Sequence, residues 1–299
     1  MTDLRETQTV ADADAPTDAV VADPLSTATT TGFRPPSAKR EHWTAVVLPP
    51  IALGAVVVGI WYLISYVVLD ERRRFLLRPP HEVVEKGFLD WDVFSDILDG
   101  LWSSARVALI GLAVSIVLGM SVAVLMSQTR LFERAIFPYM VALQAIPILA
   151  LVPLISFWFD TGQMSRVMVC VIISLFPIIV NTLFGLQSAD RGMHDLFTLQ
   201  HANRWTRLRK LMFPAALPAI FAGLRISAGL SVIGAIVGDF FFGRGDTGIG
   251  QRLRTYASQL EGEALFAAVI MSSLLGVAVF LFFGWLQRRA IGRWYDTRG

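Results

Sequence analysis

The stretch DLFTLQHANRWTRLRKLMFPAALP, Asp195 to Pro218, is a polar and basic run between two long apolar segments. The chain around it has 299 residues, of which 54% are hydrophobic and only 17% are charged. A soluble domain carries about 25% charged residues, so this composition indicates an integral membrane protein. We therefore predict that the polar run is a loop between two membrane-spanning helices.

Six apolar segments are long enough to cross a bilayer, because a helix needs about 20 residues to traverse the hydrocarbon core. We predict an all-α integral membrane protein with six transmembrane helices in one permease domain, residues 43–290. The acidic and Thr-rich residues 1–42 are predicted to be a disordered cytoplasmic tail, and residues 291–299 a short cytoplasmic one. The predicted spans are residues 44–69, 101–127, 132–158, 164–187, 215–240 and 264–287.

The loop charges predict which way the chain crosses the membrane. Six spans place both termini on the same side, and that side carries most of the Lys and Arg residues of the loops. Positive charge favours the cytoplasmic side, although the ERRR run at residues 71–74 lies on the other. We therefore predict a multi-pass protein of the bacterial cytoplasmic membrane, with both termini and the Asp195–Pro218 loop in the cytoplasm.

Polar residues and prolines inside the predicted spans are candidates for a substrate path. Pro147 removes a backbone hydrogen bond from the third span and invites a kink there. Gln144, Asn181 and Asp239 are polar side chains within or beside spans. Each of the four either lines a substrate path or takes part only in packing and interhelical hydrogen bonds.

Arg225 is a charged residue inside the fifth predicted span, where it costs at least ~2.5 kcal/mol unless it is paired or hydrated. Two roles compete for it: attraction of an anionic substrate, and a structural bond to helix carbonyls or to a neighbour such as Asn181. We favour the structural role. The substitution Arg225→Lys keeps the charge but removes the planar guanidinium, so it would distinguish the structural role from attraction of an anion.

Catalytic and metal-binding motifs are missing from the sequence. It has no GxxxxGK[ST] loop, no HExxH and no GxSxG, and its four histidines fall in loops or tails. The glycine-rich residues 243–250 follow a span rather than a strand and are predicted to be an external loop, and Cys170 a small core residue. No catalytic residue, metal site or cofactor is predicted. An ion-coupled secondary transporter and a membrane enzyme or assembly factor remain alternatives.

The polar loop itself has the pattern of a short amphipathic helix. Residues 204–213 place Trp205 and Leu208 on one face and basic side chains on another. Asn203 is suited to cap the start of this helix, and Pro214 is expected to end it. With another turn or two before it, the loop is predicted to be a helix–turn–helix. So short a helix needs a partner surface, either the bilayer or another protein.

These residues resemble the cytoplasmic coupling loop of ABC importer permeases, at about residues 190–214. The segments PAALPAIFAGLRI, QAIPILALVPLISFWF and FPIIVNTLFGLQS are similar to the branch that serves nitrate, sulfonate, taurine and thiamine-precursor uptake. The resemblance covers roughly residues 75–290. It implies a type I importer permease fold and ATP-driven import of a small solute such as a sulfonate, nitrate, or a pyrimidine or vitamin precursor.

The resemblance also implies partners. ATP hydrolysis is expected on separate cytoplasmic ATPase subunits, so this chain is not expected to be an enzyme. A second permease copy, in a homodimer rather than a heterodimer, and an extracytoplasmic substrate-binding protein complete the expected complex. Lipid surrounds it, and no nucleic acid is expected.

The coupling motif of that family carries over residue by residue onto the loop. The chain departs from the pattern at Asp195, which replaces Glu and is followed by Leu196 and Phe197 instead of two alanines, and at His201, which replaces Gly. We predict that His201 adopts the positive φ of the glycine, rather than sensing pH or binding a metal. The implied ATPase-coupling residues are Asp195, Leu196, Thr198, Leu199, His201, Ala202, Arg204, Trp205, Leu208 and Pro214.

Overall fold

The computed structural model describes residues 43–292. The chain divides into two units, residues 1–52 and 53–299. Of the first unit, only the beginning of helix α1 (Trp43–Leu63) is described, so the predicted 1–42 tail and most of the 291–299 tail lie outside the described residues. The following paragraphs concern the second unit.

The described residues are helical between short turns, and no strand occurs within 43–292. This confirms the predicted all-α fold class. After α1 the elements are η1 (Ile64–Val68), η2 (Glu71–Leu76), α2 (Pro80–Val83), η3 (Val84–Leu89), α3 (Trp91–Gln128), α4 (Arg130–Ala145), α5 (Ile148–Phe159), α6 (Gln163–Gln187), α7 (Arg191–Leu199), α8 (Arg204–Arg207), η4 (Leu208–Met212), α9 (Phe213–Phe241), α10 (Ile249–Gln259) and α11 (Gly262–Ile291).

Five described helices are long and apolar enough to cross a membrane, and a bent pair makes a sixth span if it is counted as one. The bent pair is α4 and α5, which meet at 99°, so the predicted third span, residues 132–158, consists of two helices with a sharp bend between them. The break falls at Pro147, because a proline restricts the residue before it, and Ile146 is indeed extended. The predicted kink at Pro147 is confirmed, and it is a complete break between two helices.

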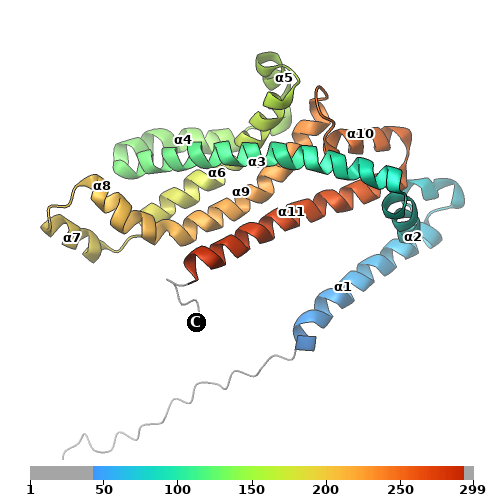
Figure 1. The fold of residues 1–299 in the computed structure, drawn as a ribbon, viewed down its shortest axis with the longest axis horizontal. Coiled ribbons are helices and arrows are strands. Elements are labelled where there is room, and N and C mark those ends of the chain that lie inside the picture. The colour runs from blue at the N-terminus through green and yellow to red at the C-terminus, as the bar shows by residue number, and fades with distance from the viewer. Residues whose placement is uncertain (1–42, 293–299) are drawn as a thin grey trace, which may run out of the picture. The chain divides into compact units, whose positions relative to one another are not determined.

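The core of the bundle is built on close contacts among α3, α6 and α9, which lie side by side in Figure 1. Small residues make these contacts possible. A Cβ on Gly234 of α9 would come within 2.8 Å of the Cα of Cys170 on α6, and Gly111 of α3 meets the other side of the same cysteine. Cys170 is buried, as predicted for a small core residue. On its other side α9 packs against α11.

The segment after Asn203 is one long helix rather than a short one. α8, η4 and α9 run on without a break as 38 residues, Arg204–Phe241. The prediction that Pro214 ends a helix over 204–213 is therefore wrong. Pro214 instead occupies the first turn of α9, directly after the wider π-helical turn Leu208–Met212, where a missing N–H and a bulky ring are tolerated.

Candidate functional site

The α7–α8 segment is a helix–turn–helix, as predicted. Asp190 caps α7 by accepting a hydrogen bond from the backbone N–H of Met193 at 3.2 Å, and Asn203 caps α8 through Thr206 at 2.7 Å. The two helices are tied together by Arg207, whose guanidinium donates to Thr198 Oγ1 at 3.0 Å. The turn between them is therefore held by the Asn203 cap and by a side-chain bridge.

His201 takes the conformation predicted for it, with φ at +51°. The surrounding hydrogen bonds form a Schellman motif: Ala202 N–H donates to Phe197 O, and His201 N–H to Thr198 O, both at 3.0 Å. The left-handed residue of this motif is usually glycine, because a Cβ is strained there. A histidine at this position therefore carries strain that a glycine would not.

We expect His201→Gly to preserve transport and to leave the complex as stable as before or more so, by up to about 1 kcal/mol. The measurement is the thermal midpoint of the purified complex together with its uptake rate. His194→Gly is the matched control, because it places a glycine inside α7, where it should destabilise by about 1 kcal/mol. A loss of pH-dependent activity between about pH 5 and 8 in His201→Gly would instead show a sensing role.

The apolar residues of the predicted amphipathic helix split into two groups. Leu208 is only 7% exposed and lies in the core with Leu186 and Phe283, whereas Trp205 is 67% exposed. Trp205 and Leu208 line one hollow, as their predicted common face requires, but Leu208 is buried and only Trp205 is exposed. On α7, Leu199 is 79% exposed. Leu208 therefore anchors the segment in the core, while Trp205 and Leu199 are exposed on its surface.

The other predicted coupling residues lie on the same helix–turn–helix. Asp195, Leu196, Thr198 and Arg204 are exposed, and Ala202 and Pro214 are half-buried. Beside them, Trp205 lines a hollow of about 500 Å³ with Phe213 and with α3 residues that include Met120. The exposed members of the predicted set thus lie on α7, on α8 and in the turn between them, at one end of the bundle (Figure 1), whereas Leu208 is buried and Pro214 belongs to α9.

The four candidate path residues do not converge. Gln144 and Pro147 are exposed at the α4–α5 break. Asn181 donates within its own helix to the carbonyl of Pro177 at 2.8 Å, and its Cβ lies against Gly223 of α9. Asp239 is 1% exposed and fully engaged, so it does not line an open path in this conformation. Of the two roles considered, Asn181 and Asp239 take the packing and bonding role here.

Asp239 belongs to a buried polar cluster that the sequence analysis did not predict. Its carboxylate accepts from the guanidinium of Arg166, which is 2% exposed, and from the hydroxyl of Ser104. Arg166 also donates to Ser103 Oγ at 3.2 Å, and Ser104 Oγ accepts from the N–H of Ile249 at 2.8 Å. The cluster joins α3, α6, α9 and the start of α10.

A sequence signal for this cluster existed. Arg166 falls near the start of one predicted span and Asp239 near the end of another that runs the opposite way, which places both at the same depth. The glycine-rich segment 243–250 is largely the predicted loop, but α10 begins at Ile249. A Cβ on Gly250 would come within 2.8 Å of the Asp239 Cβ, so the glycines permit the loop to close over the cluster.

Arg225 does not bond to Asn181, so that part of the structural prediction is wrong. Side chains at positions i and i+2 of a helix point about 200° apart. Gly223 therefore faces α6, while Arg225 faces α11. Its guanidinium lies over the ring of Phe280, with Cζ 3.8 Å from the ring centroid. It makes no hydrogen bond to any residue within 43–292, and its Nε is buried without a partner.

A bundle of apolar membrane-crossing helices with an anchored helix–turn–helix at one end is the arrangement of a multi-span membrane permease. The described residues include no group of metal-ligating side chains. The chain belongs to the family of binding-protein-dependent transport system inner membrane components, whose profile matches residues 115–292. This confirms the predicted permease function in preference to the ion-coupled carrier, and the relatives are transport permeases rather than enzymes.

Individual relatives agree with the family. The chain is 40% identical over 171 residues to the formylaminopyrimidine transport permease ThiX of Halalkalibacterium halodurans, covering 57% of this chain and 68% of ThiX. It is 34% identical to the riboflavin permease RibX of Chloroflexus aurantiacus, over 55% of this chain and 60% of RibX. The crystal structure of an amino acid ABC transporter shares the fold, with a TM-score of 0.53 and 16% identity over 68% of this chain and 98% of that one.

Proposed function

We propose that this chain is the membrane-spanning subunit of an ATP-driven importer of a small solute, and that it hydrolyses no ATP itself. Its partners are cytoplasmic ATPase subunits, an extracytoplasmic substrate-binding protein and a second copy of the chain in a homodimer. Both termini and the α7–α8 segment are cytoplasmic. The family match and the excess of basic residues on that side support this arrangement.

The observation that carries the proposal is that some apolar side chains of the α7–α8 segment are buried in the core and others are exposed. Leu208 is anchored in the core, while Trp205 is exposed at the edge of a hollow and Leu199 is exposed on α7. Large exposed apolar side chains on a held scaffold are suited to dock into another protein, with an aromatic residue as the anchor. In this proposal the partner is the ATPase.

Because α8 is continuous with α9, a movement of the docking site is transmitted to a membrane-spanning helix. ATP-driven closure of the two ATPases displaces α8, and α7 moves with it because Arg207 is bonded to Thr198. The helix then carries this displacement into the bundle without an intervening hinge loop. The bundle is thereby shifted between inward-open and outward-open arrangements.

The substrate is proposed to be a small heteroaromatic compound of the vitamin or vitamin-precursor class. ThiX and RibX are named for a formylaminopyrimidine and for riboflavin, and they support this class over nitrate and sulfonates. Specificity resides largely in the binding protein. A thermal-shift screen of that protein against pyrimidines, flavins, sulfonates and nitrate tests the class directly.

We expect substrate uptake into proteoliposomes to require ATP, the ATPase and the binding protein together. Omission of any one should reduce uptake to the level of empty liposomes. Collapse of the proton and sodium gradients by ionophores should leave the rate unchanged. Uptake that continues without ATP and stops with the ionophores would show an ion-coupled carrier and contradict the proposal.

A further inference from the structure

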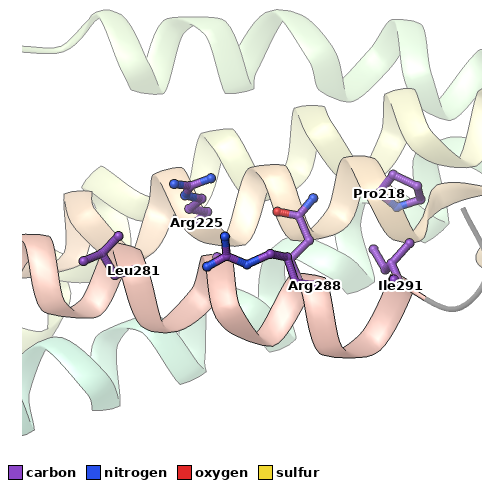
Figure 2. Close-up of a pocket in the computed structure, with 8 residues that line it drawn as sticks. Pro218, Arg225, Leu281, Arg288 and Ile291 are labelled. Atoms are coloured by element: carbon purple, nitrogen blue, oxygen red, sulfur yellow. The ribbon is translucent and has the colours of Figure 1, made fainter. Parts of the chain in front are cut away.

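A pocket of about 360 Å³ lies between α9 and α11 (Figure 2). None of its lining residues belongs to the α7–α8 segment or to the Arg166–Asp239 cluster. Arg225 enters it from α9, and Arg288 extends into it from the last turn of α11. The full lining is Pro218, Arg225, Leu281, Gly284, Gln287, Arg288, Ile291 and Gly292. Two cations therefore share one small space.

The pocket is positively charged without internal compensation. None of its lining residues is acidic. Within residues 43–292, neither Arg225 nor Arg288 has a carboxylate within ion-pair distance, whereas Arg166 in the same bundle does. Two like charges in one small space repel each other, and Arg225, whose Nε is buried, also loses hydration. This arrangement favours a bound anion.

Arg225 is held in a fixed orientation within the pocket. The ring of Phe280 covers one face of the guanidinium, and Gly284 leaves room for it: a Cβ at that position would come within 3.3 Å of Arg225 Cζ. A guanidinium that is stacked on its face keeps its edge donors available. These donors have no partner among the described residues.

We propose that this pocket binds the phosphate group of an anionic phospholipid, with Arg225 and Arg288 as its ligands. A guanidinium donates two parallel hydrogen bonds to phosphate oxygens. The pocket reaches the last turn of α11, where Arg288 follows the end of the predicted span 264–287, and its exposed Leu281 offers an apolar contact for an acyl chain. Assignment to the cytoplasmic leaflet rests on the proposed function, whereas lipid binding itself does not.

The test measures the lipid retained by the full-length permease. The protein is purified from nanodiscs of phosphatidylcholine with a minor fraction of phosphatidylglycerol, and retained lipid is counted by native mass spectrometry. We expect Arg225→Gln and Arg288→Gln each to lower phosphatidylglycerol retention about tenfold, because each removes a charge-assisted hydrogen bond. Arg289→Gln is the matched control, since Arg289 is adjacent on α11, does not line the pocket, and lies over the ring of Trp285.

A second pair of variants tests the pocket without removing a charge. Gly284→Ala adds a methyl group against the Arg225 guanidinium and should also lower retention. Gly276→Ala on the same helix is its control, because a Cβ there meets open space. Arg288 is exposed, so the Arg288→Gln result stands even if Arg225→Gln fails to fold.

The outcomes separate lipid from other anions. Equal phosphatidylglycerol retention in Arg288→Gln, Arg289→Gln and the unmodified protein would overturn the proposal. So would stabilisation by inorganic phosphate in pure phosphatidylcholine discs that matches the effect of phosphatidylglycerol, which would assign the site to a free anion. Lipid retention is measured without transport, so a failure of the proposed import function leaves this test unaffected.

Discussion

Asp239→Asn is expected to lower the yield of the folded permease markedly. The substitution removes the negative charge beside Arg166 and leaves a guanidinium that is 2% exposed without its counter-ion. Breaking a buried ion pair from one side destabilises by about 3–5 kcal/mol. Because a whole domain is stable by only about 5–15 kcal/mol, this loss removes a large share of its stability.

The measurement is the yield of monodisperse protein by size-exclusion chromatography of detergent-solubilised membranes. Asp246→Asn is the matched control. Its side chain pairs with Arg106 at 3.3 Å on the surface, and only its backbone carbonyl accepts from Arg166, which the substitution leaves intact. Exposed pairs contribute about 0–1 kcal/mol, so this variant should fold normally.

A double variant separates charge from packing in the same cluster. Arg166→Gln combined with Asp239→Asn removes both charges while it keeps polar groups in place, and should recover part of the yield that Asp239→Asn loses. Normal yield of Asp239→Asn on its own would show that the cluster does not hold the four helices together.

Trp205→Glu is expected to release the ATPase and abolish uptake while the permease still inserts and folds. The side chain is 67% exposed, so its replacement should cost the isolated permease little. A buried aromatic anchor at an interface contributes about 2–4 kcal/mol, which corresponds to roughly 30-fold to 1,000-fold weaker association. The measurement is the amount of ATPase that co-purifies with an affinity-tagged permease.

Trp91→Glu provides the same change at a similarly exposed tryptophan, at the start of α3, far along the bundle from α7 and α8 (Figure 1). It should leave ATPase co-purification unchanged. Normal ATPase binding by Trp205→Glu, with Trp91→Glu equally normal, would contradict docking through this residue.

The spans and the helix–turn–helix were predictable because they depend on local signals. Apolar length located the membrane-crossing helices, and Asn203 indicated the cap that begins α8. The continuity past Pro214 was not predictable from the rule that proline ends a helix, because the π-helical turn before it relieves the conflict. The outcome there depends on how Leu208 packs into the core, which is a tertiary effect.

The polar contacts inside the bundle were harder to predict, since they depend on which faces of which helices meet. Asn181 was a plausible partner of Arg225 by sequence, yet the two point to different neighbours. The pairing of Arg166 with Asp239 required knowledge that α6 and α9 pack together. Individual residues could be identified from the sequence, whereas their partners could not.

The unbroken helix Arg204–Phe241 has a mechanical consequence. Its 38 residues span about 57 Å at 1.5 Å per residue, with Trp205 at one end and Asp239 near the other. A rod of this length that pivots about one end through about 5° moves its other end by about 5 Å, one helical turn. The clamped Asp239 end would serve as the fulcrum of such a lever, so a small rotation there would accommodate about 4 Å of travel at Trp205.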